Sequence, residues 1–569
     1  MKARTVGVRA GTPVVVALEV LALAAFIGLP PARFGWWPAV TITAAAMLLL
    51  VPTVHRRNVP AWLAAVRRWR RSRRGTRPLA AAAVDVPHGN IVCGVRVEEY
   101  EALTMIEVTG KAYSLTFLRG STVSLTRNVL PLEVLTELLD QPGGLKLAAI
   151  DVVPAGHRVR RGNEYPPLYS TLLADRPAAG QRTMQFVVRL DIRNSVPGLQ
   201  YRQSVGAAAA AATERVINAL LERDVRATAL TAAELDTALD RLGARLQPAP
   251  PPPVVEGTDS PADPVPFRST SPAPRRRSKV SNEIGWRTIK GHPGFLTTYY
   301  FSPEDITTGS LHQMWALRTD EVVLTLTLFK RRYVEAPDGD GPVMIAATVR
   351  TNDPQPPQQP PTLYLNTLPG DQFPAALRPA PTARPDHLEI PSRPLGDPNA
   401  LEIPVGSTGI LVGSALRDDR RAVPEVQRDD LVMLSLTDPQ QATRIVMDTS
   451  EYYVRQLLIR AAAVGERIAI YSSQPNRWAR LAQPNIAVVD RRRPAEFVPS
   501  IIVNDRPLIA PPTGLSATVI TLGRLQPGGQ QPDIHFQQTS RESVRIKTAH
   551  DTIEVAIVAF NQEQAWLGL

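Results

Sequence analysis

The chain has 569 residues and a net charge of +11, which allows two or three domains and raises the hypothesis of a nucleic-acid partner. The distribution of charge argues against that class. Residues 1–84 carry thirteen lysines and arginines against one acidic residue, Glu19, and the rest of the chain has a net charge of −1. The single cysteine, Cys93, excludes an internal disulfide and gives no sign of a thiolate metal site. We therefore expect no nucleic-acid partner.

Two apolar stretches near the N-terminus, 12–29 and 35–54, are each long enough for a helix of about 27–30 Å, close to the thickness of bilayer hydrocarbon. Trp36 and Trp37 fall where a helix would enter the headgroup layer. The sequence predicts a transmembrane hairpin within residues 1–57. A cleaved signal peptide is the alternative, but a second apolar stretch follows at once and no small-x-small cleavage site intervenes. Glu19 would lie mid-span, either facing a partner helix or protonated.

The cations near the hairpin lie at its outer ends: Lys2, Arg4, Arg9, Arg56 and Arg57. The short connection between the two apolar stretches carries only Arg33. The positive-inside rule then predicts a multi-pass protein of the bacterial inner (plasma) membrane, with both termini in the cytoplasm.

Residues 58–84 form a basic juxtamembrane segment that contains seven arginines between positions 66 and 77. In "PAWLAAVRRWRR", Trp62, Val66 and Trp69 recur at helical spacing while arginines fill the other faces. This pattern is typical of a helix lying at a membrane surface, and it favours anionic lipids of the inner leaflet as the polyanion. The arginines expected to contact lipid are Arg67, Arg68, Arg70, Arg71, Arg73 and Arg74.

The remaining chain alternates ordered-looking blocks with proline-rich stretches. Strand and helix patterns indicate the first part of a cytosolic α/β domain at 85–247, a strand-rich part at 281–352 and a C-terminal α/β part at 401–569. Residues 248–280 are too poor in apolar groups to fold and are interpreted as a linker, and 353–400 as a proline-rich insertion that acts as a spacer. We predict an α/β class: a transmembrane hairpin followed by a mixed α/β soluble domain with proline-rich insertions, one composite domain rather than two.

Local signals refine this prediction. Thr231 and Glu234 form a capping-box pattern at a helix start, and Asp438-Pro439 is typical of another helix start. Gly465 is expected near the end of the helix that follows. After it, "RIAIYSS", "PNRWARLA" and "NIAVVD" predict a βαβ step, and the tail predicts four serial strands.

A search for catalytic motifs finds little. The chain lacks a phosphate-binding GxxxxGK[ST] loop, a GxGxxG after a strand, an HExxH and a GxSxG. The glycine-rich stretch 406–413 is interpreted as a turn before a strand, and none of the eight histidines lies at metal-ligand spacing from another. Asp338 and Asp340 form a DxD pattern that could hold a divalent cation, but Asp-Gly between two strands is the expected chemistry of a hairpin turn. We predict no catalytic, cofactor-binding or metal-binding residues.

The hairpin, the basic Trp/Arg segment and the stretches "HGNIVCGVRVEEYEALTMIEVTG", "LPLEVLTELLD", "GLKLAAIDVVPAGHR" and "GERIAIYSSQPNRW" together resemble EccE, a membrane component of mycobacterial type VII (ESX) secretion systems. The likeness covers the first 245 residues and about 430–480. It implies a complex with EccB, EccC and EccD and an associated mycosin protease, with export energy supplied by EccC. It also implies a cytosolic domain likened in fold to glycosyltransferases, without known activity.

Three functional hypotheses follow. The first is a non-catalytic structural subunit that stabilises an inner-membrane type VII secretion complex. The alternative is a membrane-anchored, glycosyltransferase-like enzyme that uses Asp338 and Asp340 to hold a metal. The third is a lipid-binding anchor that positions another cytosolic partner.

Overall fold

The computed structural model contains an N-terminal helical hairpin and an α/β body built on two large sheets. The residues that it describes are 6–8, 12–29, 35–54, 57–73, 76–78, 80–162, 164–246, 277–279, 283–291, 294–332, 340–384, 388–489, 495–505, 518–525 and 530–567. Among these residues, no helix combines the length and the apolar character needed to cross a membrane.

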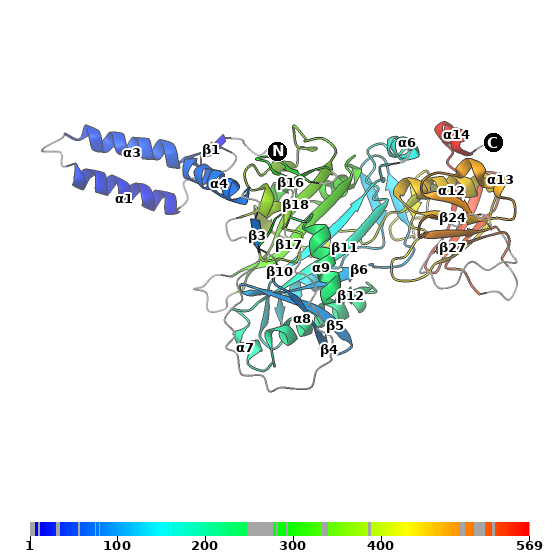
Figure 1. Cartoon of the computed structure of the whole chain (residues 1–569), viewed down its shortest axis with the longest axis horizontal. Coiled ribbons are helices and arrows are strands. Elements are labelled where there is room, and N and C mark those ends of the chain that lie inside the picture. Colours follow the sequence, from blue (N-terminus) through cyan, green and yellow to red (C-terminus); the bar gives the residue numbers. More distant parts are fainter. Residues whose placement is uncertain are drawn as a thin grey trace.

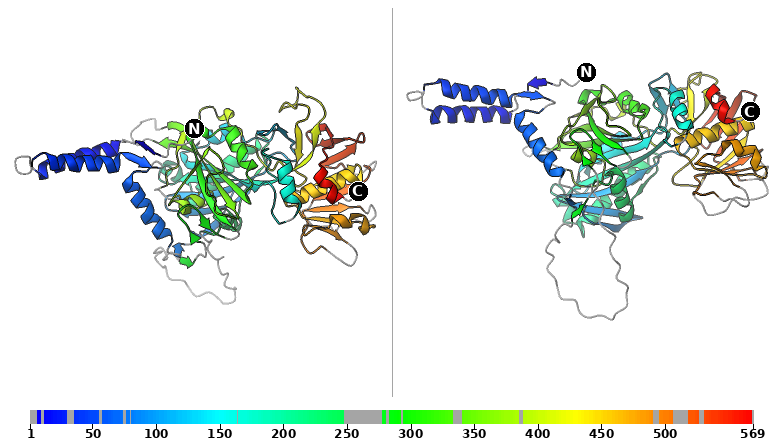
Figure 2. Two further views of the ribbon diagram at one scale, coloured as in Figure 1. Left: turned by 90° about the horizontal axis from the view of Figure 1, so that it is seen from above. Right: turned by 45° about the horizontal axis from the view of Figure 1, so that its top comes forward.

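The hairpin consists of α1 (Thr12–Gly28) and α3 (Trp37–Leu50), which lie side by side and project from one end of the molecule (Figures 1 and 2). The second helix is shorter than predicted. It ends at Leu50, and β2 (Pro52–Val54) then pairs antiparallel with β1 (Val6–Val8) at the base of the hairpin. The side chains on α1 and α3 are mostly apolar and many are exposed, including Leu23 and Leu48.

The predicted amphipathic helix is confirmed as α4 (Val59–Ser72), which connects the hairpin to the body. Asn58 caps its first turn by accepting a hydrogen bond from the amide of Ala61 at 3.1 Å. Its tryptophans pack against the α/β body, so protein covers the part of the apolar face that carries Trp62 and Trp69.

The first sheet is antiparallel throughout and, in the described residues, contains fourteen strands. Its main path runs β14-β15-β16-β18-β17-β10-β11-β6-β5-β4. The strands are β4 (Ala83–His88), β5 (Ile91–Glu98), β6 (Glu101–Val108), β9 (Asp140–Gln141), β10 (Leu145–His157), β11 (Gln181–Asp191), β12 (Ala227–Ala229), β14 (Glu283–Ile284), β15 (Ile289–Lys290), β16 (Phe295–Phe301), β17 (Glu321–Arg332), β18 (Asp340–Asp353), β19 (Leu365–Thr367) and β20 (Ser392–Pro394).

Both faces of this sheet are covered near β6. Helix α8 (Val205–Leu221) packs against one face and α9 (Ala232–Leu242) against the other. Successive residues of β6 point to opposite faces, so Ile106 packs in the core that contains α8 and Met105 in the core that contains α9. The predicted capping box is confirmed at the start of α9.

The second sheet is mixed, with twelve strands in the described part of the chain and the order β25-β24-β26-β27-β23-β28-β29-β30-β21-β22-β7-β8. Its strands are β7 (Thr116–Arg119), β8 (Val123–Thr126), β21 (Ile410–Ala415), β22 (Leu431–Leu434), β23 (Arg444–Asp448), β24 (Ile468–Tyr471), β25 (Ile486–Val489), β26 (Ile501–Asn504), β27 (Thr518–Leu522), β28 (Ile534–Gln538), β29 (Ser543–Thr548) and β30 (Thr552–Ala556). Strands β24 and β25 are parallel neighbours with α13 (Pro475–Trp478) between them, so the βαβ step is confirmed, as are the four tail strands.

Parts of the N-terminal half of the chain belong to the second sheet and its core. Strand β7 pairs with β22, and β8 pairs with β7 at the end of the sheet. Helix α6 (Tyr165–Leu172) packs against α12 (Glu451–Val464) and contributes Tyr165 and Tyr169 to the second core. The two sheets are therefore joined by exchanged segments as well as by the chain connections between them.

One local prediction is wrong. Asp438-Pro439 does not begin a helix: it lies in a loop before β23, and α12 begins only at Glu451. The Asp438 carboxylate binds Arg226 and the amide of Gln440, so it stabilises a turn instead of capping a helix. Gly465 does end α12, with a left-handed φ of 108°.

The spacer interpretation of 353–400 also needs correction. This stretch contains β19, α11 (Gln372–Ala376) and β20, and part of it is buried against the first sheet. Ala380 has no exposed surface, and Arg384 pairs with the buried Asp151 of β10. The proline-rich composition marks an irregular backbone, but the side chains still complete the core.

Candidate functional site

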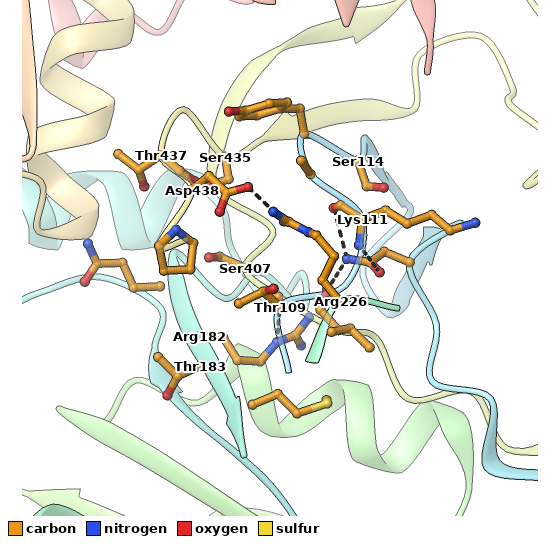
Figure 3. Close-up of a pocket in the computed structure, with 18 of the residues that line it drawn as sticks. Thr109, Lys111, Ser114, Arg182, Thr183, Arg226, Ser407, Ser435, Thr437 and Asp438 are labelled. Atoms are coloured by element: carbon orange, nitrogen blue, oxygen red, sulfur yellow. Dashed lines mark hydrogen bonds and ion pairs between the residues drawn. The ribbon is translucent and has the colours of Figure 1, made fainter. Parts of the chain in front are cut away.

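A polar pocket lies between the two sheets, with a volume of about 340 Å³ (Figure 3). The first sheet contributes β6 and β11, and the second contributes β7, β8 and the start of β27. Loops before β21 and β23 complete the lining. Hydroxyl groups are frequent in it, among them those of Thr109, Ser407, Ser435 and Thr437.

Arg182 supplies a cation to this pocket from β11. On β11 the Arg182 side chain points to the same face as those of Met184 and Phe186, which pack in the first core. Only 7% of Arg182 is exposed. Its Nε donates to the carbonyl oxygen of Gly406 at 2.5 Å, and its guanidinium carbon lies 4.9 Å from the ring centroid of Trp315. Burial lowers the pKa of Arg182 to about 9, which still leaves the side chain charged at neutral pH.

A second arginine in the pocket, Arg226, has a partner at both Nε and Nη2. Its Nε donates to the Gly110 carbonyl at 2.7 Å, and its Nη2 lies 2.8 Å from a carboxylate oxygen of the buried Asp438 (Figure 3). Gly110 has a φ of 64°, and a Cβ there would lie 2.2 Å from the Asn128 side chain, so this loop requires glycine. The Arg226–Asp438 pair therefore ties a first-sheet segment to a second-sheet loop.

The remaining buried carboxylate of the lining, Glu466, accepts hydrogen bonds from three neighbours. Gln181 Nε2 lies at 3.2 Å and Thr437 Oγ1 at 3.0 Å, and Ser500 also donates to it. The arrangement combines a charged arginine, many hydroxyls, two carboxylates that already have partners and the half-buried Glu107, whose pKa is raised by burial. Such a lining can bind a polar, anionic group.

A different site joins the hairpin to the body, and we call it the anchor junction: Arg57, Trp62, Arg68 and Trp69 on one side, with Trp286 and Asp371 of the body on the other. Trp286 stacks on Trp62 at 5.7 Å and meets Trp69 edge-on at 5.3 Å between ring centroids. Trp69 Nε1 donates to the Ile284 carbonyl at 3.2 Å. Trp62 and Trp69, which helical spacing places on one side of α4, therefore contact the body of the protein.

Charge reinforces the anchor junction. The Asp371 carboxylate, 3% exposed, binds both Arg57 and Arg68. Burial lowers the pKa of Arg57, an effect that the Asp371 charge opposes. Removing one member of such a buried charge cluster leaves the others uncompensated, which typically costs about 3–5 kcal/mol. Helix α4 is therefore fixed to the body.

The structure places the arginines and aspartates singled out in the sequence analysis in different environments. Of the arginines expected to contact lipid, Arg67, Arg70, Arg71 and Arg73 are exposed, Arg68 pairs with Asp371, and Arg74 lies outside the described residues. Asp338 also lies outside them, and Asp340 begins β18, the second strand of the predicted hairpin. Within the described residues, no group of three or more His, Cys, Asp or Glu side chains could hold a metal ion.

Sequence reasoning missed the two pocket arginines. Arg226 stands in a loop with no motif around it. Arg182 could have been identified from the sequence pattern, because it lies on the apolar face of an alternating strand. A charged side chain in that position needs a partner. The glycine-rich stretch 406–413 was correctly read as a turn before a strand, but its carbonyl contact with Arg182 depends on the tertiary structure.

Comparisons with known proteins find similar chains. A family model described as "Putative type VII ESX secretion system translocon, EccE" matches residues 178–301, which include β11, α8 and α9. "ESX-2 secretion system protein EccE2" of Mycobacterium tuberculosis is 28% identical over 498 residues, covering 84% of this chain and 82% of the relative.

Two "ESX-5 secretion system protein EccE5" sequences are also similar. The one from Mycobacterium marinum is 26% identical and covers 66% of this chain and 87% of the relative. The one from Mycobacterium tuberculosis is 28% identical and covers 65% and 86%. The match to the family model and the alignments over most of the length of these relatives show that the chain is similar to EccE proteins of ESX secretion systems.

Proposed function

We propose that this protein is a non-catalytic structural subunit of an inner-membrane type VII (ESX) secretion complex. Its similarity to EccE proteins carries the proposal, because these relatives are named as ESX secretion-system proteins. The anchor junction adds physical support: a helix fixed by three aromatic rings and a buried carboxylate can transmit position from the hairpin to the body. Holding other components in place requires that kind of rigidity.

We propose that the α1–α3 hairpin inserts in the plasma membrane. Exposed apolar side chains on both helices, such as Leu23, Ile27 and Leu48, support this assignment, as do the exposed Trp36 and Trp37 near the tip. Helices of 17 and 14 residues are shorter than an average bilayer is thick, a mismatch that membranes accommodate by local thinning. Cations at the outer ends of the hairpin favour a cytoplasmic location for the body.

The exposed arginines of α4 are proposed to contact anionic headgroups. Arg67, Arg70, Arg71 and Arg73 are free of protein carboxylates among the described residues, although Arg73 also lies over the Trp69 ring. The tryptophans of α4 contact the body, so the lipid contact is limited to the charged side of the helix. The proposed protein partners are EccB, EccC, EccD and the mycosin protease.

A complementation experiment tests the proposed role. Deleting the gene is expected to abolish export of the system's substrates and to shrink the complex extracted in mild detergent. Affinity purification of the tagged chain followed by mass spectrometry should recover EccB, EccC and EccD. Normal export in the deletion strain, or purification without these companions, would contradict the proposal.

A matched pair of variants separates scaffold from enzyme. The variant with Asp338→Ala and Asp340→Ala should restore export fully, since a scaffold needs no metal-binding DxD. The variant Asp371→Asn, which weakens the anchor junction, should restore export only partly. Failure of the double-alanine variant, with normal amounts of protein in the membrane, would favour the enzyme alternative.

A further inference from the structure

The inter-sheet pocket contains a cation whose charge the protein does not balance. Within the described part of the chain, no carboxylate forms an ion pair with Arg182, and its recorded hydrogen bond uses only Nε. Asp438 is paired with Arg226, and Glu466 is bound by Gln181 and Thr437. Glu107, a third carboxylate of the lining, is half-buried and forms no ion pair with Arg182. Burying a charge without a counter-charge is costly, so the uncompensated guanidinium suggests that an external anion completes the site.

The guanidinium is also held in position. The Gly406 carbonyl fixes Nε, and the Trp315 ring, 5% exposed, supports the guanidinium plane from one side. An arginine held in this way loses little freedom when it binds an oxyanion through two parallel hydrogen bonds. Figure 3 shows Arg182 among the hydroxyl-bearing residues of the lining.

The pocket contains a further unsatisfied group. Thr109 Oγ1 is buried and has no hydrogen-bond partner in the described structure, although polar atoms buried in proteins nearly always have one. Ser407 and Ser435, both half-buried, add hydroxyls to the same lining, and that of Ser435 donates to the Thr437 carbonyl at 3.0 Å. A volume of about 340 Å³ lies within the range of small-molecule sites.

We propose that the inter-sheet pocket binds a small polar metabolite through a phosphate or carboxylate group seated on Arg182. The pocket hydroxyls would hold the rest of the molecule. Because the lining comes from both sheets, the ligand would connect β6 and β11 to the loops of the second sheet. This site is separate from the anchor junction, so the proposal stands independently of the structural role given above.

Calorimetric titration of the full-length chain in detergent tests the site. The probes are inorganic phosphate and malonate, each titrated at constant ionic strength so that screening does not change. At least one should bind saturably, and the stronger of the two identifies which oxyanion the site prefers. Replacing Arg182→Gln should weaken this binding by about tenfold or more, because a hydrogen-bonded charge is lost. Arg541→Gln, which changes an exposed arginine, is the matched control and should bind normally.

A second variant keeps the test decisive if Arg182→Gln fails to fold. Ser407→Asp places a carboxylate in the lining next to the Gly406 contact, where it can serve as an internal counter-ion for Arg182. This variant should fold, melt at a higher temperature than the natural chain and lose the probe binding. Absence of saturable binding by either probe, or equal binding by the natural chain, Arg182→Gln and Ser407→Asp, would overturn the proposal.

Discussion

At the scale of single residues, the α/β body buries many charged side chains, and most of them lie close to a side chain of opposite charge. Asp151 binds Arg189 at 2.8 Å and also Arg384, and Glu563 accepts two hydrogen bonds from Arg460. Burial of Asp151 acts to raise its pKa, but the neighbouring arginines outweigh burial and lower it. Its contribution to folding stability is therefore complete at neutral pH and is lost only as the pH falls below the usual aspartate range.

His312, in α10 (Thr308–Gln313), also has a lowered pKa, but here burial is the main cause. It is 4% exposed, and its Nε2 has no partner in the described structure. Burial, helped by the charge of Arg182, lowers its pKa to about 4. Between its ordinary pKa near 6.5 and this value, the unfolded chain takes up a proton that the folded chain refuses, so stability falls as the pH falls.

This shift predicts an acid sensitivity that one substitution should reduce. Lowering the pH from 7 to 4 should cost the natural chain about 3 kcal/mol through His312 alone. The variant His312→Leu should lack that part of the loss. Thermal melting of both proteins in detergent at a series of pH values measures the difference. Parallel melting curves across the series would show that His312 takes up its proton in the folded state as readily as in the unfolded one.

At the scale of elements, α4 shows how far the sequence alone could be interpreted. Helical spacing of Trp62 and Trp69 correctly predicted an amphipathic helix. The pattern could not reveal what covers the apolar face, since a lipid surface and a protein surface impose the same spacing. The covering residue, Trp286, lies more than 200 positions away, and Gly370, with a φ of 83°, leaves room for its ring.

The anchor junction makes a prediction at this scale. Replacing Asp371→Asn leaves Arg57 and Arg68 without their shared carboxylate and should loosen α4. Because α4 is rich in arginine, trypsin should then cleave within residues 67–73 several-fold faster than in the natural chain. Limited digestion in detergent, followed by gel analysis of the hairpin fragment, measures the rate. Asp224→Asn, at a side chain that is 85% exposed, is the control and should leave it unchanged.

Other elements could be predicted because residues close to them in the sequence determine where they begin and end. Capping at Thr231 and the glycine end of α12 depend on neighbouring residues, so the sequence was sufficient. Asp438-Pro439 failed as a helix start because Arg226, distant in sequence, binds the aspartate. The pocket could not be predicted at all, since its lining comes from nine or so separate segments that only the tertiary fold assembles.

At the scale of the whole molecule, the exchanged segments decide which pieces can fold. Leu411, in β21, donates its amide to the hydroxyl of Tyr169 at 3.0 Å, and Tyr165 donates to Glu563 near the C-terminus. The second core thus depends on α6 and β7, both of which precede residue 180. A C-terminal piece lacking them would leave an apolar face and a sheet edge uncovered.

This dependence predicts the behaviour of fragments. Residues 401–569 expressed alone should aggregate or unfold without a cooperative transition, because they lack β7, β8 and α6. Residues 80–569, which retain these elements, should show a cooperative thermal transition and a dispersed NMR spectrum. A cooperative transition of the shorter fragment, with comparable spectral dispersion, would mean that the exchanged segments are dispensable for the second core.

The pairing of β7 with β22 also sets an order of events during synthesis. Phe117 leaves the ribosome roughly 300 residues before its partner Val432, which corresponds to tens of seconds at ordinary bacterial elongation rates. During that interval the β7–β8 ribbon has an apolar face that its partner strand does not yet cover. During translation this apolar face is therefore exposed to aggregation until the last third of the chain emerges. We expect chaperones to bind it in that period.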